Sequence, residues 1–116
     1  DTVVMRPNET LAAVYQRMKL YDVSQLPVMD NDEIVGIIDE SDVLMKVFGK
    51  PEAFKETVDT AMTSNLEFLS INTPIEELMP VFDQGRVAIV KDGDRFQGLI
   101  TRIDLLNYLR RIEENQ

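Results

Sequence analysis

Thr101 and Asp104 form a T-x-x-D pattern at the point where a short apolar strand runs into a helix. The first turn of a helix has backbone N–H groups without partners and lies at the positive end of the helix dipole, which suits a phosphate or another oxyanion. A carboxylate three residues further on can accept two hydroxyl groups, as acids in nucleotide sites do with a ribose. The same spacing is also close to a capping box, which needs no ligand. Both interpretations of Thr101 and Asp104 remain open.

The composition excludes several kinds of chemistry. The 116 residues include no His and no Cys, which removes Ser-His-Asp and Cys-His catalysis, thiolate redox chemistry and the common zinc and haem ligand sets. A net charge of -9 and a pI near 4.4 argue against nucleic acid and anionic membranes as partners. No nucleophile–base pair or metal cluster stands out, so we expect neither a catalytic residue nor a metal site.

The length and hydropathy indicate two halves that share one core. With 116 residues and 44% hydrophobic content the chain can bury a core, whereas half of it, about 55 residues, is marginal alone. No apolar run approaches the roughly 18 residues needed to span a bilayer, and no signal peptide is present, so we expect a soluble, cytoplasmic protein. Because the chain starts with Asp1 rather than Met, we expect it to be part of a longer protein.

Apolar periodicity predicts the elements that position the acid pairs. In the first half it predicts a strand at 2–5, a helix after Thr10, a hairpin of strands 26–29 and 34–38, and a helix from Asp39. A connecting helix and a turn are predicted between 52 and 65.

The second half is predicted to contain a helix that begins near Pro74 and another that begins at Thr101. Pro80 lacks an N–H and is expected to kink the first of these helices or end it early. The last helix has an expected inward face, formed by Leu105, Leu106, Leu109 and Ile112.

The second half also repeats the first. Residues 8–11 match 72–75, a shift of 64, and residues 28–42 match 90–104, a shift of 62. The sequence therefore predicts an α+β fold (mixed α/β) of two β-α-β-β-α repeats, with small mixed sheets packed on helices and a pseudo-twofold axis between the copies.

The expected organisation is a first repeat at 1–50, a linker at 51–57 and a second repeat at 58–116. The first repeat lacks a counterpart of residues 58–62, so we expect its natural start to lie before Asp1.

The duplicated pattern, L-P-V before a hairpin and G-h-h-(T/D)-x-x-D after it, resembles a tandem pair of CBS domains, known as a Bateman module. The resemblance covers essentially the whole chain and is most specific at 25–28, at 36–38 with Asp42, and at 98–101 with Asp104. Residues 101–109 are also similar to the carboxy-terminal regulatory region of cystathionine β-synthase, an enzyme that uses pyridoxal phosphate (PLP).

The resemblance implies a module that binds an adenosyl ligand such as S-adenosylmethionine, AMP, ADP or ATP in clefts between the copies. Asp104 would hold the ribose and Thr101 the phosphate or the methionine end. Arg102 is the only cation next to this site, and an acidic module fits S-adenosylmethionine or AMP better than ATP. By the same resemblance, the remaining lining residues would be Ile100, Ile103, Val23, Ser24, Gln25, Leu26 and Pro27.

A second cleft would use Asp42 for the ribose, but Asp39 stands where the family has Ser or Thr. An ionised carboxylate repels phosphate and cannot donate a hydrogen bond, which argues against a nucleotide there, although Ser41 is a partial substitute. Arg86, at the position equivalent to Ser24, either enters this cleft or is an exposed charge at a strand end.

Three functions remain open. The first is a module that binds an adenosyl ligand and allosterically controls a linked enzyme, a PLP-dependent cystathionine β-synthase by resemblance, with PLP only in that catalytic domain. The second is a ligand-free structural module, or a Bateman module of another enzyme or transporter. A free-standing enzyme is the least supported. The resemblance also implies a homodimer formed through the helices, with the catalytic domain of the parent chain as a further partner.

Overall fold

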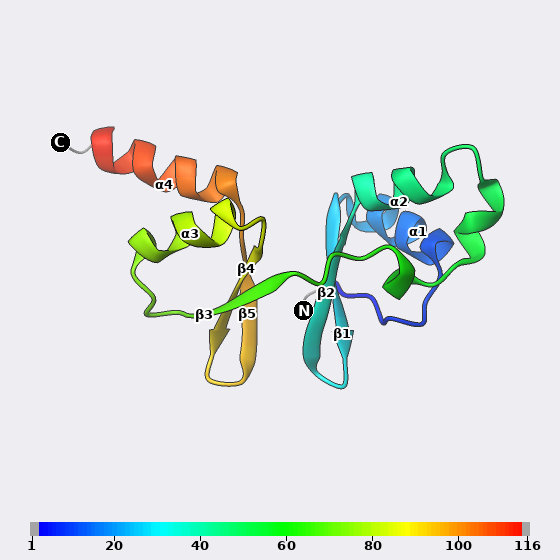
Figure 1. Cartoon of the computed structure of the whole chain (residues 1–116), viewed down its shortest axis with the longest axis horizontal. Coiled ribbons are helices and arrows are strands. Elements are labelled where there is room, and N and C mark those ends of the chain that lie inside the picture. The colour runs from blue at the N-terminus through cyan, green and yellow to red at the C-terminus, as the bar shows by residue number, and fades with distance from the viewer. Residues whose placement is uncertain (1–2, 115–116) are drawn as a thin grey trace. The chain divides into compact units, whose positions relative to one another are not determined.

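The computed structural model describes residues 3–114, which divide into two compact units with a boundary between Ser64 and Asn65 (Figure 1). The first unit holds α1 (Leu11–Tyr21), β1 (Gln25–Asp30), β2 (Glu33–Asp39) and α2 (Glu40–Val47). The second unit holds β3 (Leu66–Ser70), α3 (Leu78–Asp83), β4 (Val87–Asp92), β5 (Arg95–Ile100) and α4 (Arg102–Glu114). Each unit packs helices on a small sheet, which confirms the predicted α+β fold.

The predicted strand at 2–5 is reduced to one bridge. Met5 pairs in parallel with Val28 of β1, and Thr2 lies outside the described residues. The ladder ends at Met5 because the backbone N–H of Arg6 turns to the carboxylate of Glu9 (2.8 Å) and Pro7 has no N–H to donate.

The helix predicted after Thr10 is α1. The hydroxyl of Thr10 accepts from the backbone N–H of Ala13 (3.2 Å) and caps the helix. Leu11, Val14 and Met18 face the core of the first unit. Tyr15, which lies between them in the apolar spacing, is 49% exposed.

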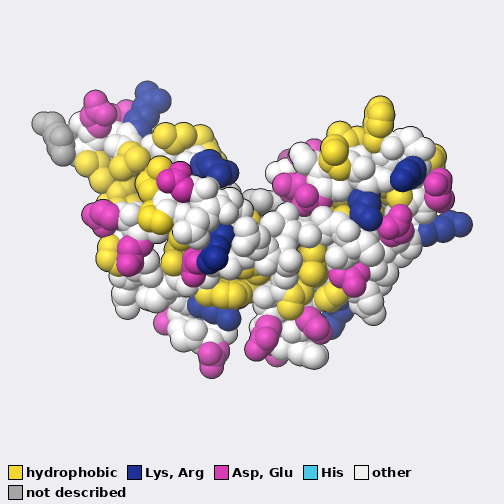
Figure 2. Space-filling model, viewed as in Figure 1, with side chains coloured by type: hydrophobic (Ala, Val, Ile, Leu, Met, Phe, Trp, Pro, Cys, Tyr) yellow, Lys and Arg dark blue, Asp and Glu magenta, His cyan; other side chains and the backbone are white. Residues whose placement is uncertain are grey.

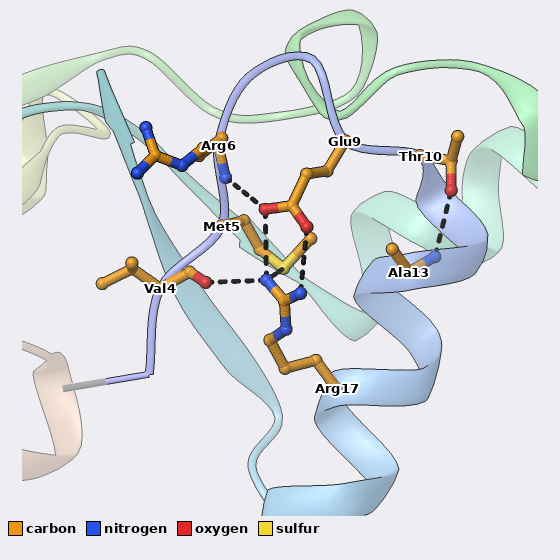
Figure 3. Close-up of polar contacts among 7 residues, drawn as sticks. All are labelled: Val4, Met5, Arg6, Glu9, Thr10, Ala13 and Arg17. Carbon is orange, nitrogen blue, oxygen red and sulfur yellow. Dashed lines mark hydrogen bonds and ion pairs between the residues drawn. The ribbon is translucent and has the colours of Figure 1, made fainter. Parts of the chain in front are cut away.

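An ion pair ties α1 to the segment that precedes it (Figure 3). The guanidinium of Arg17 donates to both oxygens of Glu9 (3.1 and 2.9 Å) and to the carbonyl of Val4 (2.9 Å). Arg17 also donates to the sulfur of Met5 at 2.9 Å. The arrangement holds residues 4–9 against the helix, and the pKa of Glu9 is lowered, chiefly by the hydrogen bond from Arg17.

The connecting helix predicted between 52 and 65 is instead two short 3₁₀ helices, Pro51–Lys55 and Val58–Thr60. Their backbone is drawn into the first unit. The N–H of Leu11 donates to the carbonyl of Glu56 (2.9 Å), and the N–H of Val58 donates to the carbonyl of Glu9 (2.8 Å). These long-range bonds replace the local bonds that a regular α-helix would need.

The second unit has a three-stranded sheet in the order β3-β4-β5, with β3 parallel and β5 antiparallel to β4. The helix predicted to begin near Pro74 was expected to kink at Pro80 or to end early there. It does not end there, because α3 continues to Asp83. A 3₁₀ turn, Ile75–Glu77, comes first, and α3 begins at Leu78, so that Pro80 lies in its first turn, where no N–H is required.

The expected inward face of α4 is wrong for three of its four residues. Leu105 is 7% exposed, but Leu106 is 61%, Leu109 is 49% and Ile112 is 38% exposed. These three residues stay exposed because α3, with 6 residues, is much shorter than α4, with 13, and covers only part of it. Figure 2 shows hydrophobic side chains gathered at the surface along α4.

The strand registers reproduce both shifts of the predicted repeat. Val28 pairs with Gly36 next to a bulge, and Val90 pairs with Gly98 next to a bulge, at a shift of 62. The parallel bridge from Met5 to Val28 corresponds to the pairing of Leu69 with Val90, where 69 minus 5 gives the shift of 64. The two halves are therefore copies in structure as well as in sequence.

Candidate functional site

Thr101 and Asp104 are joined by hydrogen bonds at the start of α4. One carboxylate oxygen of Asp104, Oδ2, accepts from the backbone N–H of Thr101 (2.9 Å) and from its hydroxyl (3.0 Å). The backbone N–H of Asp104 donates to the Thr101 hydroxyl oxygen at 3.4 Å. The capping box is therefore present, and a ligand oxyanion that takes the Thr101 hydroxyl must replace Asp104 as its acceptor.

Asp39 and Asp42 make the equivalent capping box at the start of α2. Asp39 Oδ1 accepts from the N–H of Asp42 (2.9 Å), and Asp42 Oδ2 accepts from the N–H of Asp39 (3.0 Å). Burial raises the pKa of the Asp42 carboxyl, and the negative charge of Asp39 adds to the rise, while the backbone hydrogen bond from Asp39 opposes it. The negative charges of these two acids disfavour the binding of a further anion at this end of α2.

Each capping box leaves one oxygen of the second acid available. Among the described residues, Oδ1 of Asp104 and Oδ1 of Asp42 receive no hydrogen bond. Asp104 is exposed, and Asp42 is half-buried. An oxygen held in place through its partner atom can accept a hydroxyl group without loss of the cap.

The other residues predicted around Asp104 are placed differently. Ile100 ends β5 and packs against the core of the second unit, whereas Ile103 is 60% exposed. Arg102 turns to α3, where its guanidinium donates to the carbonyl of Phe82 (3.1 Å) and lies 5.6 Å from the centre of the Phe82 ring. Arg102 makes no hydrogen bond to Asp104 in the described structure.

The predicted lining from 23–27 belongs to the first unit. Val23 and Ser24 are exposed and border a surface hollow with Glu40, whose N–H donates to the carbonyl of Ser24 at 3.1 Å. Gln25 is half-buried, while Leu26 and Pro27 are buried in β1.

Ser41 and Arg86 complete the set of predicted residues. Ser41 is exposed in the first turn of α2. Arg86 is exposed before β4 and forms an ion pair with Glu67 of β3 at 2.5 Å. This pair supplies Arg86 with a partner inside its own unit.

Sequence reasoning missed two features. The first is the ion pair between Arg17 and Glu9, which are eight residues apart, a spacing that predicts no contact. The second feature is a groove of about 280 Å³ between α3 and α4. It is lined in part by Leu106 and Leu109, which the sequence analysis expected to face inward. Across residues 3–114 there is no cluster of acids that could hold a metal ion, and no helix there is long and apolar enough to cross a membrane.

The chain holds two copies of one hairpin-and-helix unit, and each copy has a capping box with an acid at the start of its last helix. This arrangement defines a tandem-repeat α+β module. The model of the CBS domain matches residues 1–49 and 57–111. The chain therefore belongs to the CBS-domain family and carries a pair of these domains.

Curated relatives include an inosine-5'-monophosphate dehydrogenase from Methanocaldococcus jannaschii, 32% identical over 107 residues, which cover 91% of this chain and 21% of that protein. Cystathionine beta-synthase from Dictyostelium discoideum is 26% identical over 118 residues, with 97% of this chain and 24% of that protein covered. The chain thus spans between a fifth and a quarter of these relatives.

Solved structures share the fold. A CBS-domain-containing protein from Agrobacterium tumefaciens gives a TM-score of 0.78 at 23% identity, covering 94% of this chain and 90% of that one. The crystal structure of CBSX2 in complex with AMP gives a TM-score of 0.75 at 20% identity, covering 97% of this chain and 90% of that one.

Proposed function

We propose that this CBS pair is a regulatory module that binds an adenosyl ligand, S-adenosylmethionine or an AMP-type nucleotide, and allosterically controls a linked enzyme. The observation that carries the proposal is the Asp104 carboxylate, which has one oxygen held by Thr101 and the other open at the start of α4. This arrangement suits a ribose hydroxyl beside an oxyanion at a helix N-terminus. The AMP complex of CBSX2, a protein of the same fold, supports the ligand class.

The pair Asp39 and Asp42 makes the other cleft a poor nucleotide site in this proposal. A phosphate there would meet two carboxylates instead of a hydroxyl donor. One adenosyl ligand per chain is therefore expected, and the residues proposed to contact it are Thr101, Asp104, Ile100, Ile103, Arg102 and residues 23–27.

The linked enzyme in this proposal is a cystathionine β-synthase-like PLP enzyme. It is supported by the relative from Dictyostelium discoideum and by the similarity at 101–109. The inosine-5'-monophosphate dehydrogenase relative, at 32% identity, supports a different parent enzyme as the alternative.

A thermal-shift panel tests the ligand. The chain is heated with S-adenosylmethionine, S-adenosylhomocysteine, AMP, ADP and ATP in turn, each at increasing concentration. A ligand at 100 times its dissociation constant should add about 2.7 kcal/mol of stability and raise Tm by several degrees.

Matched variants separate binding from capping. Asp104→Ala and Asp42→Ala each remove the acid of one capping box, at a cost of about 0.5–2 kcal/mol. Only Asp104→Ala is expected to abolish the ligand-induced shift. No shift with any of the five compounds, or an equal loss of the shift in both variants, would count against the proposal and favour a ligand-free module for dimerisation.

A further inference from the structure

The two β-hairpins, which are copies of each other, close with different turns (Figure 1). The β1–β2 loop is Asn31-Asp32, and both residues have a positive φ, 51° and 70°, as in a type I′ turn. The β4–β5 loop is Gly93-Asp94, and only Gly93 has a positive φ there, 63°, as in a type II′ turn, which has glycine at this position. One hairpin therefore has a glycine as the first residue of its loop, and the other has an asparagine.

Asp92, the last residue of β4, stands directly before this glycine, and the two form the only Asp-Gly pair among the 116 residues. Its equivalent, Asp30, precedes Asn31 at the same place in the first hairpin. Asp30 and Asp92 are both exposed, and within residues 3–114 neither forms an ion pair. Gly93 is exposed too, and its N–H donates no hydrogen bond to the backbone of the described residues. The two sites thus differ in the residue that follows the aspartate and in the turn that contains it.

We propose that Asp92 is a modification site, at which the bond between Asp92 and Gly93 rearranges to an isoaspartyl bond through a succinimide. The backbone nitrogen of Gly93 attacks Cγ of Asp92, and the side-chain hydroxyl leaves as water together with the N–H proton. Water then adds to the former main-chain carbonyl and breaks its C–N bond, so that the chain runs through Cβ and Cγ of Asp92. The water lost in the first step is regained in the second, and the rearrangement therefore needs no oxidant and no cofactor.

The glycine at position 93 favours the attack for a steric reason. Gly93 has no Cβ atom beside the attacking nitrogen, and its backbone reaches conformations that other residues rarely adopt. In the first hairpin the Cβ atom of Asn31 crowds the same approach to Cγ of Asp30. Because loop tips tolerate local change, the tip at Asp92 can rearrange while the rest of the sheet stays paired. Asp92 is therefore expected to react much faster than Asp30.

A register shift separates Asp92 from the core of the second unit. The pairing of β4 with β5 shifts between Val90 and Lys91, and Asp92 lies on the tip side of this shift. The buried residues of β4, Ala88 and Ile89, lie on the other side. A bulge of this kind locally interrupts the ladder of hydrogen bonds. The additional backbone atom of an isoaspartate at position 92 is therefore expected to disturb the tip and to leave Tm unchanged.

The test is to age the folded chain at neutral pH in water labelled with heavy oxygen, and then to denature and digest it. The protease Asp-N cleaves before aspartate but not before isoaspartate, and the heavy oxygen found in the peptide reports passage through the succinimide. The amount of isoaspartate is expected to be at least about fivefold higher at position 92 than at position 30, because only Asp92 precedes a glycine. Isoaspartate at position 31 comes from Asn31 and is counted separately.

A reciprocal exchange of the two loops supplies the matched control. Gly93→Asn gives the second hairpin the Asp-Asn-Asp sequence of the first, and Asn31→Gly gives the first hairpin the Asp-Gly-Asp sequence of the second. Isoaspartate should then fall at position 92 in one variant and rise at position 30 in the other. Equal amounts at both positions in the wild type, no isoaspartate at position 92, or an unchanged amount there in Gly93→Asn would each overturn the proposal. A Tm that falls as isoaspartate accumulates would overturn the tolerance expected from the register shift.

Discussion

Gly36 of β2 lies directly beneath Met62. A Cβ atom on Gly36 would stand 2.5 Å from Met62 Sδ and 3.0 Å from the carbonyl oxygen of Thr63. Gly36→Ala is therefore expected to destabilise the chain by about 1–3 kcal/mol, because it overpacks a closed contact. Urea unfolding measures the change.

A double-mutant cycle identifies the cause. Met62→Ala removes the flexible side chain above Gly36, so Gly36→Ala should cost less in that background than in the wild type. Any cost of Gly36→Ala that remains in the Met62→Ala background reports the contact with the Thr63 carbonyl oxygen. This oxygen belongs to the backbone and cannot be removed by substitution. Strictly additive effects would show that Met62 is not the neighbour that matters.

Glu9→Gln is expected to destabilise the chain by about 1–2 kcal/mol, because the Arg17 guanidinium then loses its charged partner. The side chains of Arg17 and Glu9 are only 31% and 27% exposed, and further bonds to Val4 and Met5 depend on the position of Arg17. The matched control is Glu114→Gln, which breaks the Arg110–Glu114 pair, 82% and 64% exposed, and should change stability very little.

The pH dependence of the Glu9 effect has a definite sign. The pKa of Glu9 is lowered in the folded state, chiefly by the hydrogen bond from Arg17, so the unfolded state holds the proton more tightly. The contribution of Glu9 is present above its unfolded pKa and is lost as pH falls through its folded pKa. The stability difference between wild type and Glu9→Gln should therefore shrink in acid; a constant difference would contradict this.

The local elements could be predicted from the sequence because their causes are local. Turn residues at 30–32, the Thr10 cap, two short apolar runs and an apolar stripe of helical spacing define the hairpin and α1 without distant partners. The buried face of α4 could not be predicted in the same way, because burial depends on what covers a helix. Pro80 delays α3 until Leu78, and so short a helix covers Leu105 but leaves Leu106 exposed.

Contacts in and around the candidate site likewise divide into those that local spacing predicts and those that depend on distant segments. The T-x-x-D spacing predicts the contact between Thr101 and Asp104, because residues three apart meet in the first helical turn. The contact between Arg17 and Glu9 arises only after the turn at Pro7 brings the two segments together. Val23 and Thr101 belong to two different units, and no spacing within either unit could predict a site that uses both.

Asp42→Asn is expected to leave the chain as stable as the wild type near neutral pH, or more stable by up to about 1 kcal/mol. Burial raises the pKa of Asp42, with repulsion from Asp39 as a further cause, so ionisation of Asp42 is unfavourable in the folded state. Asparagine keeps an oxygen that can accept from the N–H of Asp39. The stability of the wild type should approach or pass that of the variant as pH falls through the raised folded pKa of Asp42 toward its unfolded pKa.

Thermal unfolding across this pH range checks the Asp42 prediction. Glu40→Gln is the control, since Glu40 is exposed in the same helical turn and takes no part in the capping box. A marked loss of stability in Asp42→Asn at neutral pH would mean that the charge itself supports the cap.

The exposed apolar side of α4 supports our expectation of a homodimer formed through the helices. Leu106 and Leu109 border the groove with Met79 of α3, which is itself 53% exposed. Isolated exposed side chains need no explanation, but a groove lined mostly by apolar side chains is typical of an interaction surface. Sedimentation at micromolar concentration should show a dimer, and Leu106→Glu with Leu109→Glu should shift it to a monomer.

Two controls separate association from folding in that experiment. Arg111→Glu changes an exposed charge on the same helix and should leave the dimer intact if the apolar side makes the contact. Leu105→Ala removes a buried side chain and should lower stability by about 2–5 kcal/mol, an effect that the Leu106 and Leu109 changes should not reproduce. A wild-type monomer at micromolar concentration would refute the expectation, because it would leave the groove free for a partner other than a second copy of this chain.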